Sequence, residues 1–593
     1  MPASATPGLG YFLSRNRTRG RGNSDHRRAR AIAARLLAAG LLGASQLSPA
    51  FAHGGNDHGS EGGQRPGDGT ELLTIQPRAI PRTRGLYEVW LSDQANTGGL
   101  SLTAPNGSYG GKIRIYDAFD LERPTPIDNP LVLDVSTDLF PTALSTTQAH
   151  VSRMHGILPS PDSRFMALNF VASGHLGIVD GQSKKSVCLF RTTKTSTGHQ
   201  NHMSFWSPKG DKLILANQNG RILERVDVVR DASGAVREFV FNASASLDFV
   251  GGSNRILDQP VAVDMDGVHG IGCRIEGAVA DGQPTLTPSG QPKQSPLRPL
   301  NSVICPIPSS TGKHVFASLG GGGMFVVDIQ ATPMQITADY DLSTVNAAGC
   351  GGVEAGGFMH LATGTPGPNL SEFTVYRFGL DYPSAPAFSP PNSPAPLAVW
   401  ADPDNGKLLP GSNRDAHGMA LADDGLHVFD RVRNNVEVFP IQAPWDQLQP
   451  AYSYDLTRSG QCGTTAGSST TNDPTPDLGD ISPDGETIYI ALRGPYPLTV
   501  SHAASGSCPG LGIIRRDPTT QEWTLAHVLP STVLDYGQTR NNSDPHAVIL
   551  RRNTSVPGPL PGLGVGLAVA FSRRLRRRIS LRGGAAAGGS RPG

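Results

Sequence analysis

The sequence predicts an all-β fold, a seven-bladed β-propeller whose last blade is closed by pairing of the N- and C-terminal strands. Two observations predict this fold: a strand–turn–strand phrase recurs along the chain, and no long helical period separates its copies. The composition agrees, because 71 Gly and 49 Pro in 593 residues supply the many turns that short strands need. At this length the chain would form several ordinary domains or one large repeat-built domain, and the repeat favours the second.

The recurring phrase begins with His or Asp and continues through a short apolar strand, a Ser-Pro-Asp-Gly-like turn and a second apolar strand. Such a polar turn between two apolar runs is typical of a β-hairpin. A strand-rich repeat of roughly 45–70 residues matches a propeller blade better than a sandwich. Clear copies begin at His155, His202, His417 and Asp477, and looser copies cover Asn301 to Asp328 and Gly351 to Phe378.

The two ends of the repeat array are incomplete and complement each other. The strands at 88–92 and 111–117 lack a His-led first strand, whereas 544–550 is a His-led strand without the rest. Joined, these fragments make one shared blade. With the six complete copies this predicts seven blades over residues 85–552, with a long Gly/Pro/Gln-rich insertion at 252–298.

The phrase also resembles a known family. His-Gly-Ile…Ser-Pro-Asp, from His155, and Asp-Ile-Ser-Pro-Asp-Gly-Glu-Thr-Ile-Tyr-Ile-Ala, from Asp480, are similar to the repeats of YVTN or lactonase-like bacterial propellers. The resemblance covers roughly residues 85–552. Its motifs specify the fold far better than an activity.

Residues 1–52 are predicted to be a secretory signal peptide. An arginine-rich stretch precedes the apolar run 31–42, and Ala50-Phe51-Ala52 forms an A-x-A cleavage site. Residues 53–84 then form a flexible Gly-rich lead. We therefore expect the protein to be exported.

Residues 553–593 are predicted to be a C-terminal sorting or anchor segment. An apolar run at 562–571 is followed by an arginine cluster at 573–578. This arrangement resembles a PEP-CTERM sorting signal, with Pro557-Gly558-Pro559 in place of Pro-Glu-Pro, and implies an exosortase-like processing enzyme and transient membrane contact. The alternative is a plain C-terminal membrane anchor. Under either interpretation, we expect residues 85–552 to lie in the periplasm, on the outer surface or outside a Gram-negative cell.

Six cysteines fit an oxidising compartment, because their number is even and none has C-x-x-C spacing. We expect the disulfides Cys462–Cys508 and Cys305–Cys350.

The near-neutral net charge of +1 belongs to the precursor. Residues 1–52 carry eight Arg and one Asp, and 556–593 carry seven Arg and no acidic residue, so residues 53–555 keep 36 basic and 49 acidic side chains, a net charge of −13. An acidic body excludes nucleic acid as a partner and suits cations.

The candidate site follows from the propeller fold, in which the first strand of each blade lines the central channel. The leading residues of these strands would lie around one rim, where several imidazoles could bind Cu or Zn. Alternatively, these histidines only bond the neighbouring blade. The predicted ligands are His155, His202, His417 and His546, with Asp477, Asp480, His150, His199, Glu354 and His360 as predicted neighbours.

Calcium is a further candidate ion. Segments 264–267 and 402–406 resemble fragments of calcium loops, but both lack the full D-x-[DN]-x-[DN]-G spacing and the distal Glu. Turn formation is the better interpretation of these aspartates.

Two functional hypotheses remain from the sequence. The first is an exported, non-catalytic module that binds a small-molecule or protein ligand. The alternative is an enzyme at the channel mouth, either a Cu- or Zn-dependent oxidoreductase or a lactonase-like hydrolase. The sequence contains no G-x-S-x-G, H-E-x-x-H or Walker motif.

Overall fold

The computed structural model describes 14 segments of the unit formed by residues 51–593. They are residues 84–95, 111–251, 257–265, 270–279, 298, 300–346, 349–364, 372–382, 393–405, 414–432, 434–462, 472–497, 505–533 and 541–553. The predicted signal peptide, the Gly-rich lead up to residue 83 and the C-terminal segment from residue 554 lie outside the described residues.

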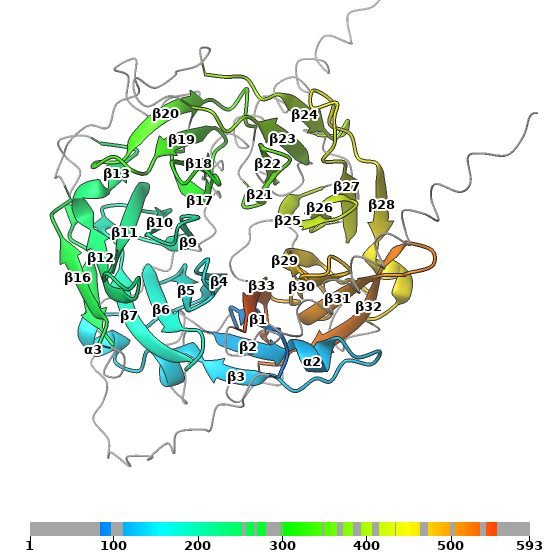
Figure 1. Cartoon of the computed structure of the whole chain (residues 1–593), viewed down its shortest axis with the longest axis horizontal. Helices are drawn as coiled ribbons and strands as arrows, with labels where there is room; N and C mark the ends of the chain where they lie inside the picture. The colour runs from blue at the N-terminus through cyan, green and yellow to red at the C-terminus, as the bar shows by residue number, and fades with distance from the viewer. Residues whose placement is uncertain are drawn as a thin grey trace, which may run out of the picture. The chain divides into compact units, whose positions relative to one another are not determined.

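The described strands form a seven-bladed β-propeller, in which seven antiparallel sheets surround a central axis (Figure 1). We number the blades along the chain and name the innermost strand first. Blade 1 contains β33 (Pro545–Arg552), β1 (Tyr87–Asp93), β2 (Lys112–Asp117) and β3 (Leu131–Asp134). Blade 2 contains β4 (Met154–Pro159), β5 (Phe165–Phe170), β6 (His175–Asp180) and β7 (Lys185–Arg191). Blade 3 contains β9 (Asn201–Trp206), β10 (Lys212–Asn217), β11 (Ile222–Arg230) and β12 (Val236–Asn242).

The other four blades have four strands each. Blade 4 contains β17 (Val303–Pro308), β18 (His314–Leu319), β19 (Met324–Asp328) and β20 (Gln335–Tyr340). Blade 5 contains β21 (Gly352–Ala355), β22 (Phe358–Thr363), β23 (Thr374–Phe378) and β24 (Ala398–Ala401). Blade 6 contains β25 (Ala416–Ala422), β26 (Gly425–Asp430), β27 (Asn435–Phe439) and β28 (Tyr452–Asp455). Blade 7 contains β29 (Pro476–Ile481), β30 (Thr487–Leu492), β31 (Gly510–Arg516) and β32 (Trp523–Pro530).

Blade 1 confirms the predicted closure. Strand β33 pairs antiparallel with β1 from Tyr87↔Arg552 to Asp93↔Pro545, so the last strand among the described residues is the innermost strand of the first blade. The propeller therefore depends on contacts between residues more than 450 positions apart in the sequence.

The remaining elements lie at the periphery or in connections. They are the helices α2 (Ala118–Leu121), η1 (Val135–Leu139), α3 (Ala143–Thr147), η2 (Ala243–Ala245) and η3 (Leu456–Ser459), and the short strands β8 (Lys194–Thr195), β13 (Leu247–Asp248) and β14 (Leu257–Asp258). None of the helices in the described part of the chain is long and apolar enough to cross a membrane.

The described parts of the 252–298 insertion extend two neighbouring blades. Strand β15 (Val261–Asp264) pairs with the outer strand β7 of blade 2, and β16 (Gly272–Glu276) runs parallel to β12 of blade 3. The disulfide Cys188–Cys273 joins β7 to β16. The insertion thus fastens blade 2 to blade 3.

The recurring turn has a clear physical basis. In the blade 7 copy, the Ser482 hydroxyl donates to the Asp484 carboxylate at 2.6 Å and accepts from the Thr487 amide at 3.0 Å, while Gly485 adopts a φ of +76°. Ser160 and Asp162 repeat this contact in blade 2 at 2.5 Å. The Ser-Pro-Asp turn therefore satisfies its own polar groups and closes the inner hairpins of blades 2 and 7.

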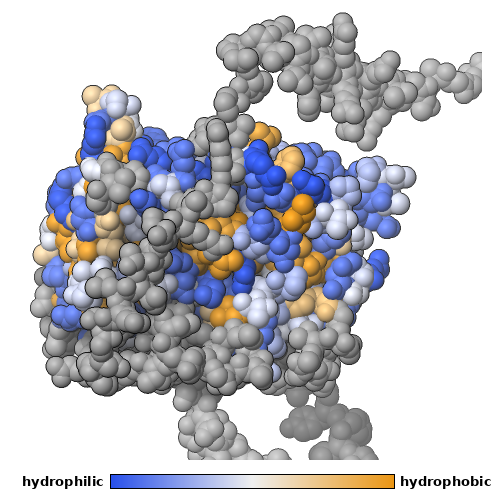
Figure 2. Space-filling view, turned by 90° about the horizontal axis from the view of Figure 1, so that it is seen from below, coloured by the Kyte–Doolittle hydropathy of each residue, from blue (hydrophilic) through white to orange (hydrophobic). Residues whose placement is uncertain are grey.

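Apolar side chains fill the spaces between blades. The cluster between blades 2 and 3, for example, includes Phe165 and Phe239 in an edge-to-face contact with ring centroids 5.2 Å apart. In the edge view of Figure 2, hydrophilic side chains occupy most of the coloured surface and hydrophobic ones form smaller groups between them. Blade-to-blade packing therefore supplies the main hydrophobic stabilisation.

Candidate metal centre

A β-bulge at one place in the innermost strands directs one side chain per blade toward the axis. The pairing register shifts there in six of the seven inner strands, and a bulge frees a residue from the ladder and re-aims its side chain. Blade 5 contributes the residue two positions before β21. We call the resulting set the blade ring: His546, His155, His202, Cys305, Cys350, His417 and Asp477, in order from blade 1 to blade 7.

Four of these residues follow one another closely around the ring. The imidazoles of His155 and His546 stack with centroids 3.5 Å apart, and those of His155 and His202 lie 4.4 Å apart. Nδ1 of His202 is 3.9 Å from Sγ of Cys305, which forms a disulfide with Cys350. The blade ring therefore brings together all four histidines that the sequence predicted as ligands.

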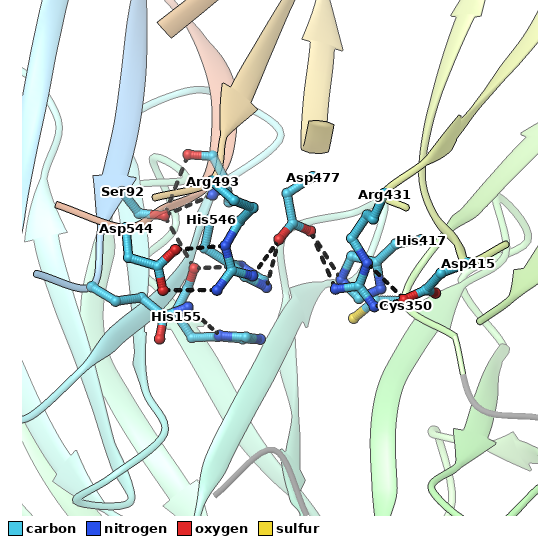
Figure 3. A network of polar contacts seen from close by, with 12 residues as sticks. Ser92, His155, Cys350, Asp415, His417, Arg431, Asp477, Arg493, Asp544 and His546 are labelled. Carbon is cyan, nitrogen blue, oxygen red and sulfur yellow. Dashed lines mark hydrogen bonds and ion pairs between the residues drawn. The ribbon is translucent and has the colours of Figure 1, made fainter. Parts of the chain in front are cut away.

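The ring closes through a carboxylate between two imidazoles, as Figure 3 shows. Oδ1 of Asp477 lies 3.2 Å from Nε2 of His417, and its Oδ2 lies 3.7 Å from Nε2 of His546. One ligand atom from each of these three residues falls within 4.8 Å of the other two. Two imidazoles and a carboxylate are a common donor set for Zn, Cu and other first-row metals. We call these residues the His417–Asp477–His546 triad.

The histidines are held by hydrogen bonds typical of metal ligands. Nδ1 of His546 lies 2.9 Å from the carbonyl oxygen of His155, and Nδ1 of His202 lies 3.0 Å from that of Ile304. Donation from Nδ1–H to a carbonyl fixes the tautomer and puts the lone pair on Nε2. In His546, Nε2 is the atom that faces Asp477.

Burial disfavours the ionised form of the Asp477 carboxylate. Asp477 and the ring histidines 155, 202 and 546 have no exposed surface, and His417 is 2% exposed. Burial raises the pKa of Asp477 to about 6, although the guanidinium groups of Arg431 and Arg493 oppose this rise. A cation bound beside Asp477 would stabilise its ionised form.

Two arginines hold this side of the ring in place. Arg493 donates to Asp477 at 2.6 Å and binds Asp544 through two hydrogen bonds of 2.7 Å each. Arg431 binds Asp415 at 2.7 and 3.1 Å, and its Nη1 lies 3.8 Å from Asp477. Three carboxylates thus face two guanidinium groups on this side of the ring, next to the imidazoles of His417 and His546.

The aspartates and arginines beside the ring also have a pattern in the sequence, which the leading residues of the repeats do not reveal. Asp415-Ala416-His417 and Asp544-Pro545-His546 repeat one D-x-H pattern at equivalent positions of two blades. Arg431 and Arg493 each follow directly after the second strand of their blades. Superposing the repeats would have placed all four residues beside the ring.

Three predicted neighbours have partners elsewhere. Asp480 lies three residues beyond Asp477 on β29, roughly 10 Å along the strand, and accepts from the Leu550 amide at 2.9 Å. His360 lies on β22, and its Nε2 accepts a hydrogen bond from Nε of Arg377 at 2.9 Å. Glu354 accepts from the amide of Ser310 at 2.6 Å.

The other two predicted neighbours lie in loops. His199 precedes β9 and contacts Nη2 of Arg191 through Nε2 at 3.0 Å and the carbonyl oxygen of Thr192 through Nδ1 at 3.2 Å. His150 lies in the loop that precedes β4, five residues before His155. Of the predicted neighbours, the structure brings Asp477 into the ring.

Of the two calcium-loop fragments, Asp264 ends strand β15 and Asp402 forms a turn. Asp402 accepts from the Asp404 amide at 2.9 Å and pairs with Arg414 at 2.9 Å. Its carboxylate is therefore engaged in a turn and an ion pair.

The disulfides join neighbouring blades. The predicted pairs Cys462–Cys508 and Cys305–Cys350 are present, and Cys188–Cys273 is the third. They link blades 6 and 7, 4 and 5, and 2 and 3. Three disulfides that use all six cysteines indicate a protein that functions outside the cytoplasm.

Comparisons with known proteins add no assignment of activity. No family model matches the chain, and no curated protein matches it. A putative 6-phosphogluconolactonase from Bacteroides fragilis superposes with a TM-score of 0.42 and 13% identity over 79% of this chain and 99% of its own. A putative 6-phosphogluconolactonase from Bacteroides uniformis superposes with a TM-score of 0.43 and 12% identity over 78% of this chain and 99% of its own. A periplasmic gluconolactonase from Pseudomonas aeruginosa superposes with a TM-score of 0.40 and 13% identity over 75% of this chain and 97% of its own. At these identities and scores the likeness carries no argument about substrate or chemistry.

Proposed function

We propose that this protein is an exported ligand-binding β-propeller whose ligand is a transition-metal ion, Cu or Zn, held at the centre of the blade ring. The observation that carries the proposal is the His417–Asp477–His546 triad, three potential ligands from three different blades whose donor atoms lie within 4.8 Å of one another. His155 and His202 continue the same ring and supply further imidazoles.

The arrangement supports a metal better than a purely structural role for the histidines. The donor atoms of His417, Asp477 and His546 come from three blades, and each lies within 4.8 Å of the other two, so one ion could contact all three. The backbone carbonyl that orients His546 is the outer-shell partner that metal-binding histidines commonly use.

The choice of ion follows from the donors. Imidazole nitrogen with one carboxylate oxygen suits Zn and Cu, whereas Ca prefers an all-oxygen site. A bound Cu ion would supply one-electron chemistry, which makes a metal-dependent oxidoreductase the second candidate function. The feature that favours this second candidate is the disulfide in the same ring, because it is a redox-active group beside an imidazole.

The test is the metal content of the purified mature protein and of single variants. The wild type is expected to hold one Cu or Zn ion per chain after dialysis, and His417→Ala and His546→Ala are expected to lose it. His527→Ala is the matched control, because His527 lies on the outermost strand β32 of blade 7. Wild-type protein without metal, or a metal content that both ring variants retain, would contradict the proposal.

We also propose that the C-terminal segment sorts the exported protein through an exosortase-like protease that removes it after transient membrane contact. The apolar run 562–571 and the arginines 573–578 support this role. Tagged full-length protein and a variant lacking residues 556–593 would be located by cell fractionation. The same final location and the same mature mass for both forms would refute sorting.

A further inference from the structure

The part of the blade ring outside the triad combines an imidazole with two sulfur atoms. Ligand atoms of His202, Cys305 and Cys350 lie within 4.8 Å of one another, and all three residues are buried. Gly351, which follows Cys350, lies against the carbonyl oxygen of His417, so this part of the ring adjoins the triad, and Figure 3 draws Cys350 near His417. In the structure the two cysteines form a disulfide.

This disulfide differs from the other two in its position. Cys188–Cys273 joins the outer strands β7 and β16, and Cys462–Cys508 connects the segment after η3 to the segment before β31. Cys305–Cys350 alone lies in the ring, where one ring nitrogen of His202 falls within 4.8 Å of both sulfur atoms. The other two disulfides show that neighbouring blades can be joined outside the ring, so a position inside the ring is not needed for a structural link alone.

We propose that the Cys305–Cys350 disulfide is a redox-switched ligand pair, which after reduction binds a soft metal ion, Cu(I), together with His202. Two external thiols supply the two electrons and two protons that break the S–S bond, and they leave as their own disulfide. Cu(I) binding then releases both protons from the Cys305 and Cys350 thiols. Thiolate sulfur selects Cu(I), whereas the oxygen of Asp477 does not. This ligand set contains no residue of the His417–Asp477–His546 triad.

The backbone around the two cysteines is held independently of the disulfide. Cys305 lies in β17, which pairs with β18, and the Ser318 hydroxyl of β18 donates to the carbonyl of Gly349 at 2.7 Å. The Cα atoms of the two cysteines are 5.3 Å apart. Reduction would therefore leave two thiols close together, beside an imidazole, at the meeting point of two fixed blades.

The experiment compares oxidised and reduced forms of metal-depleted protein. Both are titrated with Cu(I) under anaerobic conditions against a competing Cu(I) chelator, the reduced form after treatment with a phosphine and its removal. Reduced wild type is expected to bind one more Cu(I) than the oxidised form. Cys305→Ser/Cys350→Ser is expected to lose this ion, and His202→Ala to bind it more weakly by at least the roughly 10- to 100-fold that loss of an outer-shell partner costs.

The chain offers a closely matched control. Cys462→Ser/Cys508→Ser removes a disulfide that spans 46 residues, against 45 for Cys305–Cys350, and should keep the additional ion. Circular dichroism confirms that each variant is folded before titration. This control separates loss of a ligand pair from loss of a blade fastener.

Three results would overturn the proposal. Alkylation and mass spectrometry could show that the phosphine does not open Cys305–Cys350 in the folded protein. Reduced wild type could bind no additional Cu(I), or the additional ion could survive substitution of both ring cysteines. Failure of the triad would appear instead as an absence of metal in the oxidised form, so the two proposals fail separately.

Discussion

Replacing Arg493 by methionine should destabilise the closure of the propeller. The guanidinium group is fully buried and makes three charge-assisted hydrogen bonds of 2.6–2.7 Å, one to Asp477 of blade 7 and two to Asp544 beside the closing strand β33. Methionine has a similar length but leaves both buried carboxylates without this cation. Breaking a buried ion pair in this way costs about 3–5 kcal/mol.

The assay is urea unfolding of the metal-free protein, monitored by tryptophan fluorescence. Arg493→Met should lower the free energy of unfolding by about 3–5 kcal/mol, and Arg493→Met/Asp544→Asn by less, because one stranded carboxylate is removed. Arg515→Met is the control, since Arg515 of β31 bonds backbone carbonyls of Leu121 and Arg123 near the surface. Equal losses for the two single variants, or a loss below about 1 kcal/mol for Arg493→Met, would refute the reasoning.

Three further predictions concern the ring and its supports. Metal affinity of the wild type should fall as pH falls through about 6, because the Asp477 carboxylate then takes up a proton. In metal titrations at several pH values, Asp477→Asn should release about one proton fewer on binding the metal, so its affinity should depend less on pH. Gly418→Ala should abolish metal binding and lower the melting temperature, since its Cβ would overlap the carbonyl oxygen of Asp477; an unchanged metal content would count against the ring geometry. Removing the 46-residue Cys462–Cys508 link should cost up to about 4 kcal/mol by loop entropy without changing metal content, and loss of metal would be the contrary result.

The fold could be predicted from the sequence because each blade carries its own local signal. The inner hairpins of blades 2 and 7 have a polar turn whose Ser and Asp bond each other, so these copies recur visibly, and the incomplete ends led directly to the β1–β33 pairing. The looser copies in blades 4 and 5 were also placed correctly.

The site was predictable only in part, because its geometry depends on contacts between blades. The leading histidines were found from their position in the repeat, but Cys305 and Cys350 were identified only as a disulfide and not as ring members. The bulges that turn these residues toward the axis have no signature in a single repeat. Arg493 was missed because its two partners come from different blades.

X-ray absorption at the metal edge of the purified, oxidised protein would reveal whether the His417–Asp477–His546 triad binds an ion. We expect one Cu or Zn ion per chain with at least two imidazole nitrogens and one oxygen in its first shell, and loss of the imidazole contribution in His546→Ala. A protein without metal, or an ion whose first shell contains only oxygen and is unchanged in His546→Ala, would contradict this expectation.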